Sequence, residues 1–433
     1  MILFISSKSV SLIVTLFILS FPFFLWKIDK YSYIKPKELK FEPSDNEINQ
    51  KYCGSNECKF LFAYNVVEQE TQSNQHFMSF IQIAQQLGRI MVLTNVGEST
   101  ISSTKNFPFD FYYNIDELRR KFPKVKFISQ QRFQKWTKER YFKPDIIHVL
   151  LENSKLDPNY RIQYDISYID RLVKEYRIDK FDLNLNNSVT FKQVGIGITA
   201  GPRKTKKNEL RKFLSAELKS NAEVMLITQE TIRHPIYERL TPMPYANHIT
   251  KAALNITKKL KPYIAIHWRM ETGKIGLMPR CAKSLVTYLK KLSLKTGIKN
   301  IYLATDYPFF KQNGKLKTQS STFTKIHKEH HIAMKILKSS FKINTWVSTH
   351  GLDYLQSYPI KNEHLQEEFG GSGIQGIFDK LILTQADYFI GGPKKCCRFN
   401  STYTDHVIMA RKEMRKKNLK FKNIIYRWKL KSK

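Results

Sequence analysis

The sequence predicts an α/β fold of two domains that follow an N-terminal membrane anchor. Its 433 residues are more than one hydrophobic core usually holds, which favours two domains. Short apolar runs without Pro or Gly alternate with stretches in which apolar residues recur at helical spacing, the pattern of strands followed by helices. We expect the anchor at residues 1–30, a stem at 31–52, a first domain at 53–248 and a second at 249–433.

The anchor is predicted from the uncharged segment Val10 to Trp26, which lies between Lys8 and Lys27. Its length is at the short limit for a membrane-spanning helix. Because no small-residue cleavage site follows it, we expect an uncleaved signal anchor and not a removed signal peptide. The prolines and mixed charges of residues 31–52 are typical of an unstructured tether. We therefore expect a single-pass membrane protein of the Golgi or endoplasmic reticulum with the domains after the stem in the lumen.

The chain is strongly basic, with a formal net charge of +35 from 72 Lys and Arg against 37 Asp and Glu. A polyanion partner is one explanation of such a charge. However, the lysines are scattered, and no Arg-rich helix, zinc-finger spacing or RNA-binding aromatic strand accompanies them. We expect no nucleic acid partner, and favour compositional drift together with a small anionic ligand.

The five cysteines agree with passage through the secretory pathway. Cys53 and Cys58 are close enough to form a small disulfide loop, and Cys281 could pair with Cys396 or Cys397, although buried free thiols are the alternative. Their spacing does not suggest a zinc site. Sequons begin at Asn186, Asn255 and Asn400, and we expect glycans on one or both of the first two.

The first domain opens with a strand at Phe60 to Tyr64, followed by a polar loop from Val66 to Gln75. Apolar residues then recur at helical spacing from Phe77 to Leu87, and the chain returns as a strand at Arg89 to Leu93. This is a β–loop–α–β unit whose loop would lie at the ligand-binding edge. Further strands are predicted at three places, Ile146 to Leu151, Val194 to Thr199 and Val224 to Thr228.

The centre of the second domain is a predicted buried strand, Tyr263 to Ile266, which ends in three alternating polar residues, His267, Arg269 and Glu271. In open α/β sheets, ligands bind beyond the carboxyl ends of the strands. An Arg at such an end suits a diphosphate, because its planar fork donates two charge-assisted hydrogen bonds. The alternative is a structural Arg–Glu pair beside a capping His.

The remainder of the second domain repeats the strand and helix pattern. Ile301 to Asp306 is a strand that ends in an acid, and an apolar stripe from Ile374 to Ile382 predicts a helix before the strand Asp387 to Ile390. The loop that follows reaches Asn400 to Thr404, whose hydroxyl and N–H groups at a helix start could hold phosphate. The basic end, Lys412 to Lys433, has enough apolar residues to pack as a helix.

Three motifs in this order resemble the GDP-fucose protein O-fucosyltransferase superfamily. They are HWRMET at residues 267–272, IYLATD at 301–306, and the helix, strand and loop from Gly376 to Arg411. Ser73-Asn74-Gln75 before a helix is similar to the donor-side loop of that family. The resemblance spans about residues 58 to 411.

The resemblance implies a GT-B fold, with two Rossmann-like domains facing across a cleft, and inverting transfer of fucose from GDP-fucose without a metal. The acceptor would be a protein Ser or Thr hydroxyl or a glycan. The absence of an Asp-x-Asp motif fits metal independence. By the same resemblance, Arg269 and Asn74 would serve catalysis, and six residues would bind the donor: His267, Arg269, Asp306, Ser401, Thr402 and Tyr403.

The chain departs from the family pattern in its N-terminal loop, where Gln72 and Ser73 replace the usual glycines. The base that accepts the proton of the acceptor hydroxyl is also open, and Glu70 and Glu271 are the candidates. The altered loop favours an alternative function. The chain would then be a catalytically degenerate glycosyltransferase-like membrane protein that only binds a glycan or a protein. A basic membrane-anchored adaptor is a further alternative, which a phosphate clamp argues against.

Overall fold

The computed structural model describes residues 43–433, apart from 67, 153–181, 186–188, 197–203, 230–235, 238–239, 309, 313–314, 318–322, 324, 356–361, 370, 399–400, 418–421 and 432–433. Within this range, Asp45–Lys433 forms one unit. Among these described residues, no helix combines the length and apolar character needed to cross a bilayer. The predicted anchor and residues 31–42 of the predicted stem lie outside the described residues. The expectation of an unstructured tether is wrong for the end of the stem, because Asp45–Cys53 forms helix α2 with Ile48 and Cys53 buried.

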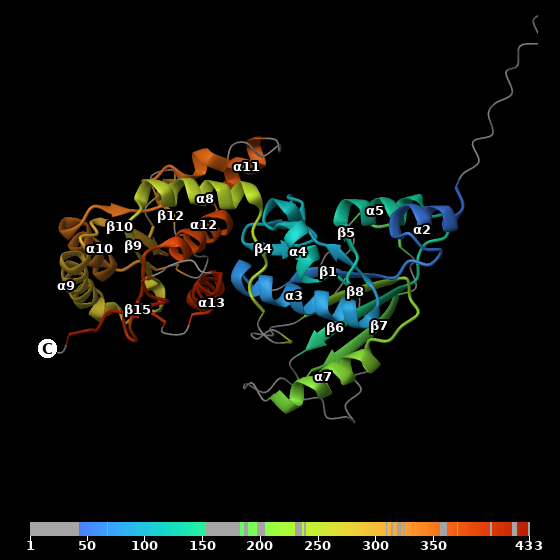
Figure 1. The fold of residues 1–433 in the computed structure, drawn as a ribbon. Helices are drawn as coiled ribbons and strands as arrows, with labels where there is room; N and C mark the ends of the chain where they lie inside the picture. Colours follow the sequence, from blue (N-terminus) through green and yellow to red (C-terminus); the bar gives the residue numbers. More distant parts are fainter. Residues whose placement is uncertain are drawn as a thin grey trace, which may run out of the picture. The chain divides into compact units, whose positions relative to one another are not determined.

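The first sheet contains eight strands among the described residues and is mostly parallel (Figure 1). The strands β3, β4, β1, β8, β6 and β7 follow one another across it, while β2 pairs with β1 and β5 pairs with β2. Only the pairs β1–β4 and β3–β4 are antiparallel. The strand bounds are β1 Phe60–Val66, β2 Ile90–Leu93, β3 Val96–Gly97, β4 Thr100–Ser102, β5 Phe127–Ser129, β6 Ile146–Glu152, β7 Val189–Gly195 and β8 Val224–Gln229.

Helices cover both faces of this sheet because alternate side chains of β1 point to opposite sides. Leu61 and Ala63 pack in one cluster with α3, whereas Phe60 and Phe62 pack in another with α2 and α5. Helix α3 ends at Gly88, whose φ of +64° is the left-handed cap that a glycine adopts without strain. The helix bounds are α2 Asp45–Cys53, α3 Glu70–Leu87, α4 Ile115–Lys121, α5 Gln130–Glu139 and α7 Lys204–Glu217, with a 3-10 turn at Phe109–Phe111.

The second sheet is fully parallel, with the strand order β13, β10, β9, β14, β15. Its strands are β9 Tyr263–Trp268, β10 Asn300–Thr305, β13 Ile343–Asn344, β14 Tyr388–Gly391 and β15 Tyr426–Arg427. The chain runs outward from β9 to β10 and β13, and then returns to β14 on the other side of β9. The carboxyl end of β9 is therefore the switch point at which an open α/β sheet forms its ligand crevice.

Helices also pack on both faces of the second sheet. Tyr263 and Ala265 of β9 join the cluster that contains α8 and α12, while Ile264 and Ile266 join the one that contains α9 and α10. The helix bounds are α8 Asn247–Leu260, α9 Met278–Thr296, α10 Lys328–Ser340, α11 Asn362–Phe369, α12 Ser372–Gln385 and α13 Thr402–Lys416. Three 3-10 turns lie at Met270–Thr272, Ile275–Leu277 and Gly351–Leu355, and β11 Phe310–Gln312 pairs with β12 Lys315–Lys317 in a small hairpin. The predicted α/β fold is thus confirmed, with a second β/α sheet after residue 260.

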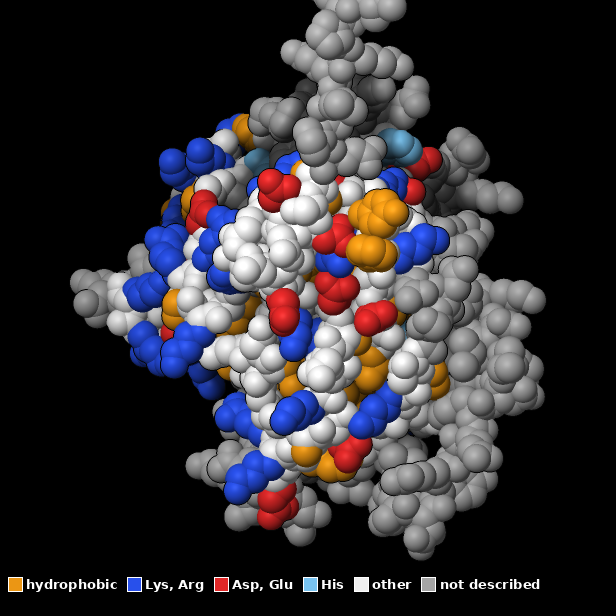
Figure 2. All heavy atoms as spheres, turned by 90° about the vertical axis from the view of Figure 1, so that its right-hand side faces the viewer, with side chains coloured by type: hydrophobic (Ala, Val, Ile, Leu, Met, Phe, Trp, Pro, Cys, Tyr) orange, Lys and Arg blue, Asp and Glu red, His pale blue; other side chains and the backbone are white. Residues whose placement is uncertain are grey.

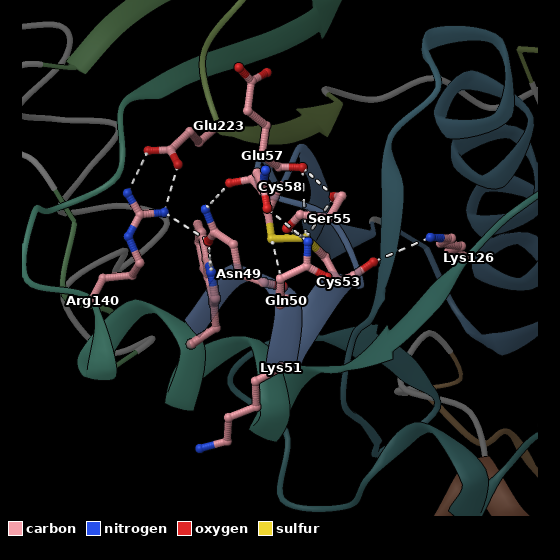
Figure 3. The surroundings of a disulfide bond; sticks show 12 residues. Asn49, Gln50, Lys51, Cys53, Ser55, Glu57, Cys58, Lys126, Arg140 and Glu223 are labelled. Carbon is pink, nitrogen blue, oxygen red and sulfur yellow. Dashed lines mark hydrogen bonds and ion pairs between the residues drawn. A yellow bond between two sulfur atoms is a disulfide. The ribbon is translucent and has the colours of Figure 1, made fainter. Parts of the chain in front are cut away.

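Two disulfides are present among the described residues. Cys53 and Cys58 form the small loop that their spacing predicts, between α2 and β1 (Figure 3). Cys281, in the first turn of α9, pairs with Cys396, which leaves the buried Cys397 as a free thiol. The second bridge ties α9 to the loop after β14.

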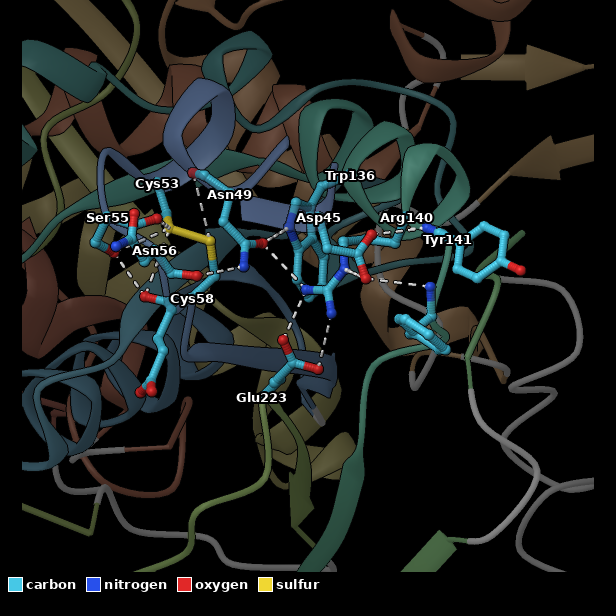
Figure 4. A network of polar contacts seen from close by, with 12 residues as sticks. Asp45, Asn49, Cys53, Ser55, Asn56, Cys58, Trp136, Arg140, Tyr141 and Glu223 are labelled. Carbon is cyan, nitrogen blue, oxygen red and sulfur yellow. Dashed lines mark hydrogen bonds and ion pairs between the residues drawn. A yellow bond between two sulfur atoms is a disulfide. The ribbon is translucent and has the colours of Figure 1, made fainter. Parts of the chain in front are cut away.

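A buried network fastens the start of the described chain to the first sheet (Figure 4). Arg140, just after α5, contacts Asp45 at 3.1 Å, the side chain of Asn49 at 3.0 Å and Glu223 at 2.7 Å. Trp136 donates its indole N–H to the same Asn49 side chain at 2.9 Å. Helix α2 is thereby held to α5 and to the edge of β8.

The basic charge is spread out on the face that Figure 2 shows. Lys and Arg side chains are scattered over it, with Asp, Glu and uncharged residues between them. This face therefore offers no continuous basic patch for a polyanion.

Three element predictions are wrong in their bounds. Helix α3 begins at Glu70, inside the segment predicted to be a polar loop, because its first polar side chains are buried in hydrogen bonds and not exposed to solvent. The strand expected at Val194 to Thr199 is β7 at Val189–Gly195, which pairs in parallel with β6 from residue 146 onward. The basic C-terminus does not continue as a helix: α13 ends at Lys416, and the chain returns as β15.

Candidate functional site

A pocket lies at the carboxyl end of β9 and holds about 690 Å³ of space, part of it open to solvent. Its walls come from the start of α3, the ends of β9 and β10, helix α12 and the start of α13. The lining residues are Gln69, Glu70, Thr71, Ser99, His267, Arg269, Ala304, Thr305, Asp306, Gly373, Gly376, Asp379, Lys380 and Tyr403.

Arg269 and Glu271 form an ion pair directly after β9. The Arg269 side chain is 26 % exposed and lines the pocket, whereas that of Glu271 is 8 % exposed and does not line it. The extended backbone ends at Trp268, and Met270–Thr272 turns as a 3-10 helix. The structure therefore contains the Arg–Glu pair of the structural alternative, but with the guanidinium also available to a ligand in the pocket.

Asp306, at the end of β10, holds this turn in place. Its two carboxylate oxygens accept the backbone N–H groups of Met270 at 2.7 Å and of Glu271 at 3.0 Å. Burial raises the pKa of Asp306 to about 6, although the two N–H donors act in the opposite direction. Asp306, which the resemblance predicts to bind the donor, lines the pocket and positions the Arg269 turn.

His267 is part of a stack against α13. Its Nδ1 lies 2.9 Å from the hydroxyl of Thr404, and its ring stacks on Tyr403 with centroids 4.6 Å apart. Burial, and then the nearby Arg269 and Arg427, lower the pKa of His267 to about 3, so the ring is neutral at physiological pH. The Tyr403 hydroxyl donates to the carbonyl of Gly376 at 2.9 Å, which ties the stack to α12.

The predicted phosphate loop enters the site through Tyr403. Ser401 is the N-cap of α13 and accepts the N–H of Thr404 at 3.0 Å. Neither Ser401 nor Thr402 lines the pocket, and Asn400 lies outside the described residues. Their donor-binding roles stay predictions.

The loops after β9 and β14 are joined by hydrogen bonds. Trp268 donates its indole N–H to the Cys396 carbonyl at 3.0 Å, and the N–H of Lys274 bonds the carbonyl of Lys395 at 2.8 Å. A Cβ added to Gly273 would lie 2.6 Å from the Cys396 carbonyl oxygen, so this close approach requires a glycine. The turn that carries Arg269 is thus supported from both neighbouring strands.

Glu70 is the centre of a buried polar cluster. Its Oε1 accepts the hydroxyls of Tyr113 and Tyr245, each at 3.1 Å, and its Oε2 pairs with the Lys380 ammonium. The side chain lines the pocket. The candidate base therefore has three donors on its carboxylate.

Asn74 lies inside α3 and does not line the pocket. Its Oδ1 accepts the N–H of Met243 at 3.1 Å, and Gln75 bonds the backbone of Leu240 through both amide atoms. These two side chains fasten the segment that precedes α8 to α3. The catalytic role predicted for Asn74 stays a prediction, and a positioning contact is what the structure places there.

Sequence analysis missed Asp379 and Lys380, which line the pocket from α12. Asp379 accepts the Tyr302 hydroxyl at 2.6 Å, and burial raises its pKa to about 7, against the effect of that hydrogen bond. No signal in the sequence marks them, because both fall between the stripe positions Phe378 and Leu381, where an amphipathic helix normally exposes polar residues. Charged residues are rarely buried without partners.

Gly373, in the first turn of α12, marks a close approach of α12 to the first sheet. A Cβ at this position would lie 2.6 Å from the backbone nitrogen of Ser99. Nearby, Glu368 of α11 accepts the N–H of Glu98 at 2.8 Å and the hydroxyl of Tyr112. Among the described residues, no group of three or more His, Cys, Asp or Glu side chains could hold a metal ion.

The chain is similar, at low identity, to solved fucosyltransferase structures. POFUT1 in complex with GDP-fucose is 15% identical over 82% of this chain and 94% of that chain, with a TM-score of 0.46. The NodZ alpha-1,6-fucosyltransferase soaked with GDP-fucose is 11% identical over 82% of this chain and 93% of that chain, with a TM-score of 0.37. Fucosyltransferase NodZ from Bradyrhizobium is also 11% identical, with the same TM-score. A sequence comparison with curated proteins finds no match.

The family comparison is more direct. The profile of the GDP-fucose protein O-fucosyltransferase family matches residues 71–394, a range that includes β9, β10 and α12 and therefore most of the pocket wall. The chain belongs to the GDP-fucose protein O-fucosyltransferase family.

Proposed function

We propose that this chain transfers fucose from GDP-fucose to a hydroxyl of a protein Ser or Thr or of a glycan, with inversion and without a metal. Family membership supports the donor and the reaction class. The observation that carries the proposal is the position of Arg269. This cation lies at the carboxyl end of the central strand β9, and its side chain lines the pocket. The proposed setting is the lumen of the Golgi or endoplasmic reticulum, behind the predicted anchor.

In this proposal Arg269 binds the diphosphate and His267 helps to hold the nucleotide. The departing GDP gains negative charge in the transition state, and a preorganised guanidinium stabilises that charge more than it stabilises the ground state. Asp306 supports this by fixing the turn that aims Arg269. Because His267 is neutral, it contributes a hydrogen bond or a ring contact and not a second positive charge.

Glu70 is the proposed base, because it lines the pocket whereas Glu271 does not. A base must reach the hydroxyl from which it takes a proton. Glu271, paired with Arg269, is the alternative base.

A binding protein without transferase activity is the second candidate. It is favoured by the helical geometry of Gln72 and Ser73, where the family has a glycine loop, and by the carboxylate partners that both pocket cations already have. Such a protein would not need to bind a guanine nucleotide.

The two candidates are separated by thermal denaturation of the full chain with GDP, GDP-fucose, UDP or no ligand. The proposed function predicts that GDP and GDP-fucose raise the melting temperature and that UDP does not. At a ligand concentration of 100 times Kd, the stabilisation would be about 2.7 kcal/mol. Equal melting temperatures in all four samples would contradict a guanine-nucleotide donor.

A further inference from the structure

The ion pair between Glu70 and Lys380 lies in the wall of the pocket, and both of its residues are buried. The two residues are 4 % and 3 % exposed. The Lys380 ammonium also contacts the hydroxyl of Thr71, at 3.2 Å. The partners are 310 positions apart in the sequence, so the contact joins the first turn of α3 to the second half of α12.

Stabilisation of the fold does not by itself account for this pair. Two charges taken out of water are often no more stabilising than apolar residues of similar volume. The contacts of the Lys380 ammonium with Glu70 and Thr71 lie at the pocket wall and not in the apolar core of α12. Instead, the chain places a cation in the wall of a pocket proposed to receive a diphosphate.

The surroundings of Lys380 connect it to the end of β9. Its ammonium lies 5.3 Å from the ring centroid of Tyr245 and 5.6 Å from that of Tyr403. Tyr403 in turn stacks on His267, two residues before Arg269. Burial lowers the pKa of Lys380, while Glu70 raises it.

We propose that Lys380 is a second phosphate-binding cation. Its ammonium pairs with Glu70 when no donor is bound, and with the diphosphate of the donor once the donor binds. The inference rests on the proposed function and extends it. The two negative charges of the diphosphate would then meet one guanidinium and one ammonium, each released from a carboxylate. A charge-assisted hydrogen bond of this kind contributes about 1.5 to 3 kcal/mol, or roughly 10- to 100-fold in affinity.

The exchange also removes the ammonium from one oxygen of Glu70. That oxygen can then accept a hydrogen bond from the acceptor hydroxyl. Once the donor is bound, Glu70 can accept the proton of the acceptor hydroxyl, while the hydroxyl oxygen bonds to C1 of fucose and the C1–O bond to GDP breaks. The negative charge passes to GDP, beside Arg269 and Lys380. Donor binding would therefore activate the base.

The test compares the affinity for GDP and for guanosine in the wild type and in three variants: Glu70→Gln, Lys380→Met and the double variant. Glu70→Gln removes the competitor for the ammonium, so GDP should bind roughly 3- to 10-fold more tightly. The double variant should bind GDP roughly 10- to 100-fold more weakly than Glu70→Gln. Guanosine, which has no phosphate, should bind all four proteins alike.

The double variant guards against misfolding. Lys380→Met alone leaves a buried carboxylate without its cation and could fail to fold. The double variant leaves no unpaired charge, and the Tyr113 and Tyr245 hydroxyls can still donate to the amide oxygen. Lys121 is a matched control, because it is a partly buried lysine that bonds a backbone carbonyl and does not line the pocket. Lys121→Met should leave the GDP affinity unchanged.

Each outcome of this test supports or contradicts a specific part of the proposal. If the wild type binds no GDP, the proposed function fails and this inference fails with it. If the wild type binds GDP but the double variant matches Glu70→Gln in affinity, only the role of Lys380 is overturned. If Glu70→Gln weakens GDP binding, Glu70 and Lys380 act together as a fixed structural unit, and the exchange is wrong.

Discussion

The carboxylate of Asp306 accepts the backbone N–H of Glu271 at 3.0 Å, across the ends of two neighbouring parallel strands. Its other oxygen accepts the N–H of Met270. The residue that ends β10 thus determines the conformation of the turn that ends β9. Two of the motifs that mark the family are one structural unit.

This arrangement predicts a pH dependence with opposite signs for activity and stability. The pKa of Asp306 is raised from 3.8 to about 6. Since only the carboxylate accepts both N–H groups, the activity should fall as the pH drops through about 6. The folded state binds the extra proton between about pH 4 and 6, so the contribution of Asp306 to the free energy of unfolding rises as the pH falls through this window.

The measurements are kcat/KM and melting temperature from pH 5 to 8, for the wild type and for Asp306→Asn. An amide keeps one acceptor and places an NH2 group against the other N–H, so the variant should be less active at every pH. It should also lose the step near pH 6. An unchanged step in the variant would assign that ionisation to another group.

Arg269→Lys tests the catalytic cation. The charge is kept but the bidentate fork is lost, so turnover should fall roughly 100- to 1000-fold, equivalent to about 3 to 4 kcal/mol. The melting temperature should change little, because a partly exposed ion pair contributes at most about 1 kcal/mol. Arg269→Ala should also weaken GDP binding.

Glu271→Ala is the matched control for Arg269→Ala, because both variants remove the ion pair and only Glu271→Ala leaves the guanidinium. If the pair only holds the turn, Glu271→Ala and Arg269→Ala should lose the same stability and the same activity. Wild-type turnover in Arg269→Lys would show that the assigned role is wrong.

Metal independence predicts that EDTA leaves the rate of fucose transfer unchanged. The physical reason is that Arg269, together with the proposed second cation Lys380, supplies the positive charge that a divalent cation supplies in metal-dependent transferases. The assay is transfer to acceptor with EDTA, and again after manganese is added. Loss with EDTA and recovery with manganese would contradict the proposed chemistry.

Glycosylation tests the proposed lumenal setting. Asn255 is exposed on α8, so we expect a glycan there when the chain is made in a eukaryotic secretory pathway. Asn186 is a second expected site, outside the described residues, and Asn400 should stay bare because a glycan there would fill the donor cleft. Peptide mass spectrometry with Asn255→Gln as control measures this. Complete glycosylation of Asn400 in active protein would contradict the placement of that loop.

The parts of the fold that sequence analysis predicted best are those with strong local patterns. The apolar runs of β1, β8 and β9 and the stripe of α12 each predict one element, because buried strands and amphipathic helices have distinct periods. Segment 66–75 was misjudged because polarity normally indicates exposure. Here Ser73 and Asn74 are buried, and each makes a backbone contact, Ser73 with the carbonyl of Val66 and Asn74 with the N–H of Met243.

The site was predictable only in part, for a physical reason. Three of the predicted residues lie at the carboxyl ends of strands: His267, Arg269 and Asp306. The carboxyl ends of neighbouring parallel strands meet at one edge of the sheet. No such rule predicts which side chains surround Glu70. Tyr113, Tyr245 and Lys380 come from separate elements, and only tertiary packing places their donors on one carboxylate.

The bridge between Cys281 and Cys396 has a practical consequence for anyone who prepares this enzyme. Cys397 is the immediate neighbour of Cys396 and keeps a free thiol. A host that oxidises thiols without proofreading can join Cys281 to the wrong neighbour, which would displace by one residue the loop that carries the Trp268 and Lys274 contacts. Such an isomer would have the correct mass and a distorted donor pocket, so a batch of mixed isomers would show partial specific activity. Replacing Cys397 by Ser removes the competing thiol and leaves a single way to close the bridge.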